Sequence, residues 1–192
     1  MRRIGLLGGT FDPVHKGHVK IAESFINSGC IDELWILLTP FPPHKTDEKH
    51  ASYNDRLKML KGAFAKTKCE ILSIENELPK PSFTYITIQI LKEHNPDYKF
   101  FFCMGEDSLV AFHKWKHFEK ILEEADLLVA RRPNSNHSAV NKTILQHTVF
   151  VDHKPVEISS SEIKNRISDS DFLIHNLPTE VISIIDKENL YR

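Results

Sequence analysis

The stretch GGTFDPVHKGH, residues 8–18, places two histidines three residues apart, shortly after the apolar run IGLL. Gly8 and Gly9 allow backbone N–H groups to approach a ligand closely, and the N-terminus of the helix expected next favours an anion. His15 and His18 sit at positions i and i+3 of that helix start, so they face one volume and can hydrogen-bond phosphate oxygens. The stretch matches neither the P-loop nor the G-x-G-x-x-G pattern, and no further zinc ligand is singled out. The chemistry favours phosphate binding over a metal site, with exposed histidines of no function as the alternative.

Two further stretches place polar side chains directly after apolar runs. In FPPHK, His44 and Lys45 offer a titratable donor and a fixed positive charge in a loop stiffened by prolines, although an ordinary solvated loop has the same composition. In MGEDSL, Gly105 permits a close approach and Asp107 can accept hydrogen bonds from ribose hydroxyls. The alternative for this second stretch is that Asp107 or Ser108 caps a helix.

Three features later in the chain add an aromatic ring, cations and hydroxyls. Trp115 lies in the polar stretch FHKWKHFE, where its ring either stacks on a flat ligand or packs against the protein. Arg131 and Arg132 end an apolar run and suit phosphate or carboxylate recognition. Three serines at 159–161 begin a predicted helix, where capping explains one hydroxyl and a bound phosphate would use the others, with Lys164 adding charge. Together these groups indicate electrostatic positioning of phosphates, not covalent catalysis.

The elements that must position these residues alternate along the chain. Helical spacing follows most of six short apolar runs, and Ser52 is a predicted N-cap with Asp55 three residues later. The segment 160–189 is mostly helical in pattern. Such alternation predicts an α/β fold with a doubly wound parallel sheet and a helical C-terminal part. Ligands of such sheets bind beyond the carboxyl ends of the strands. The six runs that read as strands are RRIGLLG, ELWILLT, CEILSI, KFFFCMG, ADLLVAR and TVFVD.

Composition limits the classes of function. The 192 residues suit one domain, 1–192, with 41% hydrophobic and 27% charged residues. A formal net charge of −1 argues against a nucleic-acid partner, and no stretch approaches the ~20 apolar residues of a membrane span. Cys30, Cys69 and Cys103 are widely spaced and lie in or beside apolar runs, so we expect reduced cysteines in a cytoplasmic protein. The oligomeric state stays open.

Taken together, these motifs resemble the nucleotidylyltransferase superfamily, whose signature is a strand, an (H/T)-x-G-H turn and a late serine-rich helix start. Within it the chain looks like the bacterial nicotinate-nucleotide adenylyltransferases, and the resemblance spans essentially the whole chain. The motifs that carry it, in order, are GGTFDPVHKGH, PPHK at 42–45, PSFT at 81–84, GEDSL at 105–109, Trp115, RRP at 131–133, ISSSEIK at 158–164 and LYR at 190–192.

The resemblance implies a Rossmann-like fold and a role for each matching residue. His15 and His18 would contact the ATP phosphates, and His44 and Lys45 would help to hold the phosphates of both substrates. Thr84 and Trp115 would bind the pyridine ring and its carboxylate, with Lys116 beside them. The remaining ATP-binding residues would be Gly8, Gly9, Thr10, Phe11, Gly105, Asp107, Arg132, Ile158, Ser159, Ser160, Ser161 and Lys164.

Three positions depart from the family pattern. Ser161 replaces the usual threonine and keeps the hydroxyl, whereas Lys164 replaces the usual arginine and loses its bidentate fork. Lys116 follows Trp115 where an aromatic residue is common.

The reaction implied by the resemblance is in-line attack of the nicotinate mononucleotide phosphate on the α-phosphorus of ATP, with Mg²⁺ carried by ATP. A related enzyme with another acceptor, such as phosphopantetheine, and a nucleotide-binding module without turnover are the alternatives. The choice between nicotinate and nicotinamide mononucleotide stays open, and so does the division of labour between the two histidines.

Overall fold

A parallel six-stranded sheet forms the centre of the computed structural model, which describes residues 1–40, 50–78, 80–132 and 140–192. The strand order is β3-β2-β1-β4-β5-β6, and every neighbouring pair is parallel. All six apolar runs predicted as strands are confirmed. The strands are β1 (Arg2–Gly9), β2 (Glu33–Leu38), β3 (Cys69–Leu72), β4 (Tyr98–Gly105), β5 (Ala125–Arg131) and β6 (Thr148–Asp152).

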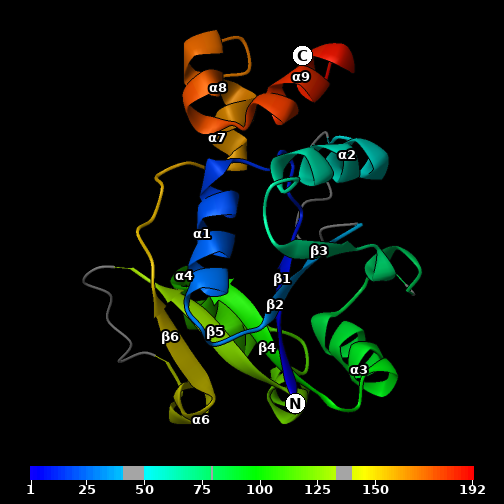
Figure 1. The fold of residues 1–192 in the computed structure, drawn as a ribbon, viewed down its shortest axis with the longest axis vertical. Helices are drawn as coiled ribbons and strands as arrows, with labels where there is room; N and C mark the ends of the chain where they lie inside the picture. Colours follow the sequence, from blue (N-terminus) through cyan, green and yellow to red (C-terminus); the bar gives the residue numbers. More distant parts are fainter. Residues whose placement is uncertain (41–49, 79, 133–139) are drawn as a thin grey trace.

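Helices cover both faces of the sheet (Figure 1). The first face carries α1 (Lys16–Asn27), α2 (Tyr53–Ala63), α7 (Ser160–Asn165), α8 (Ser170–Asn176) and α9 (Thr179–Lys187). The second carries α3 (Thr84–His94), α4 (Glu106–Ala111), α5 (Phe118–Glu124) and α6 (Lys142–Gln146). Two 3₁₀ turns, η1 (Ile74–Asn76) and η2 (Phe112–Lys114), complete these elements. The doubly wound α/β prediction is therefore confirmed, as are the helical C-terminal part and the Ser52 cap, whose hydroxyl accepts the Asp55 N–H.

Alternation along the strands divides the core into two clusters. Leu6 and Phe102 pack on the second face, whereas their neighbours Leu7 and Phe101 pack on the first. Successive side chains of a strand point to opposite faces, so a strand covered by helices on both sides must be apolar at nearly every position. This requirement explains why the strands appear in the sequence as continuous apolar runs.

The order of the strands reverses beside β1, which lies between β2 and β4. In open α/β sheets this switch point forms a crevice outside the carboxyl ends of the strands. Gly9 ends β1 and Gly105 ends β4, so two of the predicted ATP motifs begin there. In Figure 1 the C-terminal helices α7, α8 and α9 stand at the top of the view, beyond the start of α1 and beside α2. They therefore lie at the same end of the molecule as the predicted phosphate site.

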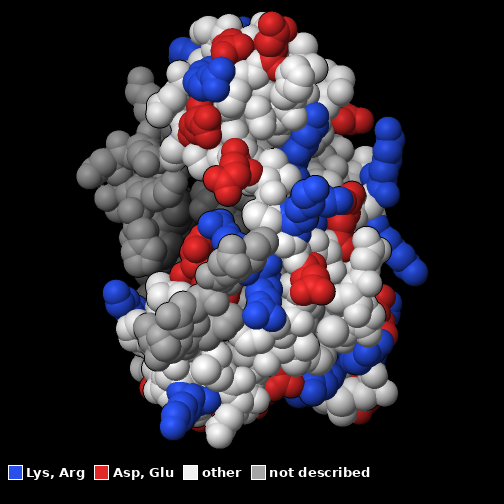
Figure 2. All heavy atoms as spheres, turned by 90° about the vertical axis from the view of Figure 1, so that its left-hand side faces the viewer, with Lys and Arg blue, Asp and Glu red and all other residues white. Residues whose placement is uncertain are grey.

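The surface view of Figure 2 shows Lys and Arg side chains interspersed with Asp and Glu side chains on one face of the molecule. This pattern agrees with the balanced composition. In the described ranges, no helix combines the length and the apolar character that a bilayer crossing requires.

Candidate active site

The turn between β1 and α1 begins later than the glycines suggested. Gly8 and Gly9 pair with Leu37 and Leu38 as the last residues of β1, so they belong to the strand and not to a flexible turn. A Cβ atom at Gly9 would lie 2.8 Å from the ring of Phe11, which is buried and has a φ of +47°. Gly9 is needed here because the Phe11 ring folds back over it.

His15 and His18 lie together at the start of α1, as their spacing predicted. Their rings stack with centroids 3.7 Å apart, and the Phe11 ring meets His18 edge-on at 5.0 Å. His15 is only 6% exposed, so the alternative of two exposed histidines is wrong for this residue. A Cβ atom at Gly17 would lie 2.9 Å from His15 Nδ1, which shows that the G of H-x-G-H makes room for the first histidine ring.

The protonation of the two rings follows from their surroundings. Burial lowers the pKa of His15 to about 4, and burial together with the neighbouring His15 lowers the pKa of His18 well below its usual value. His18 Nδ1 accepts the backbone N–H of His15 at 3.2 Å. A neutral imidazole carries its proton on the nitrogen that does not accept, so the His18 proton resides on Nε2. The pair therefore offers hydrogen-bond donors without fixed positive charge.

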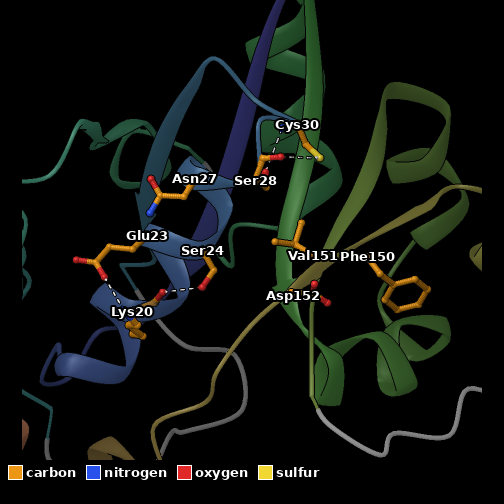
Figure 3. Close-up of a pocket in the computed structure, with 9 residues that line it drawn as sticks. All are labelled: Lys20, Glu23, Ser24, Asn27, Ser28, Cys30, Phe150, Val151 and Asp152. Carbon is orange, nitrogen blue, oxygen red and sulfur yellow. Dashed lines mark hydrogen bonds and ion pairs between the residues drawn. The ribbon is translucent and has the colours of Figure 1, made fainter.

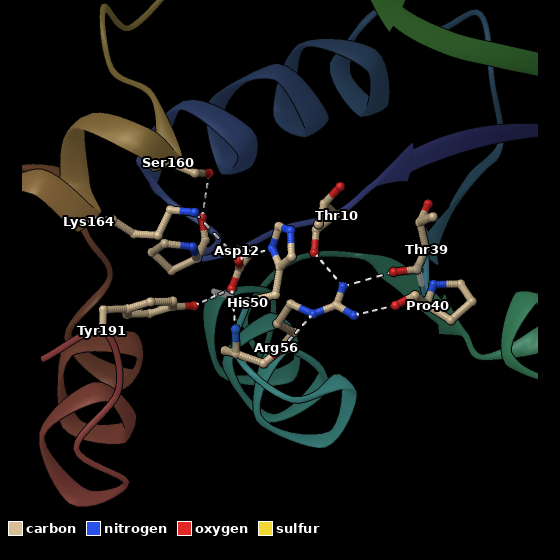
Figure 4. A network of polar contacts seen from close by, with 11 residues as sticks. Thr10, Asp12, Thr39, Pro40, His50, Arg56, Ser160, Lys164 and Tyr191 are labelled. Carbon is tan, nitrogen blue, oxygen red and sulfur yellow. Dashed lines mark hydrogen bonds and ion pairs between the residues drawn. The ribbon is translucent and has the colours of Figure 1, made fainter. Parts of the chain in front are cut away.

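Arg56, on α2, holds the backbone around this turn, and sequence reasoning missed it. Arg56 is 2% exposed. Its guanidinium donates to the carbonyl oxygens of Thr10 at 2.8 Å, Thr39 at 2.8 Å and Pro40 at 2.9 Å, as Figure 4 shows. Desolvation lowers the pKa of Arg56 below its ordinary value. The sequence did contain a sign of this role. Arg56 lies three residues before the buried Met59, which places an arginine on the apolar face of the helix.

Asp12 is the buried acid of the turn and was also missed. It is 4% exposed, and its carboxylate contacts the His50 ring at 2.6 Å and the Ala51 N–H at 3.1 Å. Lys164 Nζ lies 3.8 Å from Asp12 Oδ2. Since Lys164 belongs to the late motif on α7, this ion pair joins the first and last ATP motifs (Figure 4).

The three serines before and within α7 have three different surroundings. Ser159 is the N-cap, and its hydroxyl accepts the Glu162 N–H at 3.1 Å. The Ser160 hydroxyl donates to the Pro13 carbonyl at 2.9 Å, across 147 residues of chain. Ser161 is exposed. Ile158, before the cap, packs against the core cluster and lies 3.2 Å from the position of a Gly17 Cβ. The start of α7 therefore lies directly against the histidine turn.

At the ends of β4 and β5, Asp107 and Arg132 form an ion pair at 2.9 Å. Both side chains are exposed, by 76% and 53%. The N-cap of α4 is Gly105, so the alternative that Asp107 or Ser108 caps this helix is wrong. The missed residue is Glu106, which is 3% exposed and accepts the Arg132 backbone N–H at 2.7 Å.

The predicted mononucleotide residues lie on the second face of the sheet. Thr84 is the first residue of α3, and Lys116 Nζ lies 4.1 Å from the ring centroid of the adjacent Phe83. The partly buried Trp115 ring contacts Phe102 edge-on at 5.6 Å and Phe112 at 5.5 Å. The Trp115 ring therefore packs against the protein, and stacking on a flat ligand stays a prediction. The structure thus brings Lys116 to the start of α3.

Glu75 is a further missed acid, and it anchors the start of α3. It is 6% exposed, and its carboxylate accepts the hydroxyls of Thr87 at 3.2 Å and Ser82 at 3.5 Å, and that of Thr39 at the end of β2. Burial raises the pKa of Glu75. Its partners lie at the start of α3 and at the end of β2, which is why no local spacing indicated it.

Some predictions lie outside these observations. His44 and Lys45 fall outside the described residues. Among the side chains that are described, no group of three or more His, Cys, Asp and Glu residues is placed to hold a metal ion. A groove of about 420 Å³ lies between α1 and β6 (Figure 3), but its lining contains no predicted site residue: Lys20, Glu23, Ser24, Asn27, Ser28, Cys30, Phe150, Val151 and Asp152.

The chain is similar in sequence to a known protein family and to bacterial proteins. The model of the cytidylyltransferase-like family matches residues 6–166. A probable nicotinate-nucleotide adenylyltransferase of Flavobacterium johnsoniae is 36% identical over 191 residues, 99% of each chain. That of Halalkalibacterium halodurans is 34% identical over 194 residues, covering 100% of this chain and 92% of the relative.

Among solved structures, the fold is similar to a Plasmodium falciparum nicotinic acid mononucleotide adenylyltransferase complexed with NaAD. The TM-score is 0.82 at 21% identity, with 100% of this chain and 98% of that chain covered. Sequence identity to the bacterial relatives and the match over most of the chain make the assignment: this chain belongs to the nicotinate-nucleotide adenylyltransferase family, within the cytidylyltransferase-like proteins.

Proposed function

We propose that this chain transfers the adenylyl group of ATP to nicotinate mononucleotide. An oxygen of the mononucleotide 5′-phosphate attacks the α-phosphorus and forms the new P–O bond. The bond from the α-phosphorus to the oxygen bridging it to the β-phosphorus breaks, and pyrophosphate leaves with that electron pair. The products are nicotinate adenine dinucleotide and pyrophosphate. The attacking phosphate is already ionised near neutral pH, so the reaction needs orientation and charge stabilisation more than a general base.

In this mechanism His18 donates from Nε2 to a phosphate oxygen of ATP. The donor is set in advance because His18 Nδ1 already accepts the His15 N–H. A donor fixed by the fold needs no reorganisation when charge develops on the oxygens, and that is how such sites stabilise a transition state. Ser161, Lys164 and Arg132 would meet the remaining ATP oxygens from the other side of the crevice.

We propose that Mg²⁺ arrives with ATP and is held by ATP oxygens, where it would neutralise charge on the phosphates. The donor set around the turn favours this proposal, because the groups there are imidazoles, hydroxyls and cations instead of clustered carboxylates. We also propose a cytoplasmic location, which the three free thiols support.

The observation that carries the proposed function is the contact between Ser160 and Pro13. The Ser160 hydroxyl donates to the Pro13 carbonyl at 2.9 Å, so the serine-rich helix start and the H-x-G-H turn form one surface. Two motifs that are far apart in sequence are each suited to phosphate, and together they can hold a chain of phosphates between them.

The experiment measures pyrophosphate release from ATP with nicotinate mononucleotide, nicotinamide mononucleotide and phosphopantetheine, each giving a kcat/KM. We expect the nicotinate compound to be used, and we expect His18→Ala to lose on the order of 10²-fold in kcat or more with folding intact. Turnover of phosphopantetheine alone would identify a related enzyme with a different acceptor. ATP binding without turnover of any acceptor would identify a nucleotide-binding module.

A further inference from the structure

The motif LYR at the end of the chain has no role in the mechanism above, yet Tyr191 reaches the nucleotide turn. Its hydroxyl donates to Asp12 Oδ1 at 2.6 Å, although 179 residues separate the two. The ring is partly buried and packs against the core cluster of the first face. The backbone of Tyr191 has a φ of +65°, a conformation that costs free energy for a residue with a side chain. The fold therefore holds Tyr191 in a strained backbone conformation in which its hydroxyl reaches Asp12.

The contact completes the coordination of a buried carboxylate. Asp12 Oδ1 accepts from Tyr191 and from the Ala51 N–H, while Oδ2 faces the His50 ring and Lys164 Nζ. These four partners come from three separate segments of the chain, because His50 and Ala51 are neighbours. Burial and the bond to Asp12 raise the pKa of Tyr191, so the hydroxyl keeps its proton and donates.

Asp12 lies three residues before His15, and Lys164 is one of the residues assigned to ATP. If Oδ1 loses a donor, more of the carboxylate charge acts on the two partners at Oδ2, and the acid is no longer held in one orientation. Lys164 would then bind more strongly to Asp12 and be less available to phosphate. The turn that carries His15 and His18 would lose one of its anchors, the contact between Tyr191 and Asp12 that Figure 4 shows.

We propose that Tyr191 is a positioning residue for adenylyl transfer, acting through Asp12 to hold the histidine turn and the Lys164 side chain in the geometry that ATP requires. This inference rests on the proposed function. It assigns Tyr191 no contact with substrate. We therefore expect the loss of its hydroxyl to lower kcat and kcat/KM for ATP. The KM for nicotinate mononucleotide should not change, because the predicted mononucleotide residues Thr84 and Trp115 lie on the opposite face of the sheet.

The test is Tyr191→Phe, which removes only the hydroxyl. We expect kcat/KM for ATP to fall on the order of 10-fold, with the KM for nicotinate mononucleotide unchanged. The matched control is Tyr53→Phe, because the Tyr53 hydroxyl is buried and has no hydrogen-bond partner in the described part of the chain. Tyr53 packs against the same core cluster, so its variant removes the same atom from a similar environment without touching Asp12.

A double-mutant cycle separates positioning from general stability. In an Asp12→Ala background, which removes both acceptor oxygens, adding Tyr191→Phe should change kcat/KM for ATP by less than about 2-fold, since the hydroxyl would act only through the carboxylate. All assays run below the melting temperature of every variant, and a chain ending at Leu190 provides a second removal of the contact.

The outcomes are distinct. An unchanged kcat/KM for ATP in Tyr191→Phe overturns the inference alone, and so does an equal rise in KM for both substrates. The inference is also overturned if Tyr191→Phe and Tyr53→Phe lose activity to the same extent. A wild-type chain that releases no pyrophosphate with any acceptor overturns the proposed function and, with it, this inference.

Discussion

The neutral His15 should make the folded chain sensitive to acid in a defined pH window. Burial lowers its pKa from 6.5 to about 4. The unfolded chain therefore binds a proton at this position that the folded chain does not, and the free energy of unfolding falls as the pH drops through this interval. Each pKa unit corresponds to about 1.4 kcal/mol, so the loss attributable to His15 should reach roughly 3 kcal/mol near pH 4. Above about pH 6.5 the contribution is complete and no longer changes.

Urea denaturation of the wild type and of His15→Asn, followed from about pH 7 to about pH 4.5, measures this loss. Asparagine is a favourable N-cap, so the variant keeps a capping residue at the start of α1. The raised pKa of Glu75 acts in the opposite direction, because protonation of a buried acid stabilises the fold as the pH falls. Glu75 is present in both proteins, so it cancels in the difference. At about pH 4.5 the wild type should have lost roughly 2 to 3 kcal/mol more than the variant. Parallel stability curves would refute the assignment of a neutral, buried His15.

Further predictions concern the cap, the aromatic pocket and the buried arginine. Ser159→Ala should cost about 1 kcal/mol of stability with little change in the KM for ATP, whereas Ser161→Ala should raise that KM and leave urea denaturation unchanged. In a Trp35→Phe background, nicotinate mononucleotide should quench the fluorescence of Trp115, and an unchanged emission at saturating substrate would contradict stacking. Arg56→Lys should lower the free energy of unfolding by roughly 3 kcal/mol in urea denaturation, because one ammonium group cannot reach all three carbonyls that the planar guanidinium holds. A loss below about 1 kcal/mol would argue against this anchoring role.

The sheet was predictable because its strands are parallel and covered on both faces. Each strand must then be apolar throughout, and six such runs stand out between helical patterns. The H-x-G-H turn and the serine-rich helix start were predictable for another reason. Their residues lie within single short segments, so the spacing in sequence already fixes their spacing in space.

The residues that sequence reasoning missed hold together segments that are distant in sequence. Arg56 joins the ends of β1 and β2, and Glu75 joins the start of α3 to Thr39. Asp12 lies inside the first motif, but its partners come from three other parts of the chain. A pattern read along one segment cannot show such partners, because which loops meet depends on the order of the strands. Sheet order also decides that Asp107 faces Arg132 at the ends of neighbouring strands.

The site holds its backbone with buried side chains and keeps a cation for the phosphates at the surface. The free-energy cost of removing a charge from water explains this division. Within the protein, the turn is held by hydrogen bonds of Arg56 and Asp12 to partners that satisfy them, and the two histidines are kept neutral by burial. A buried imidazolium pair would repel itself and would lose its hydration, so positive charge for the phosphates is better placed where water can reach it. Arg132, more than half exposed and paired with an exposed Asp107, has such a position. Its pairing energy is small in water, so an incoming phosphate can replace the aspartate at little cost. The buried donors are therefore oriented before ATP binds, while the exposed cation can exchange one anionic partner for another.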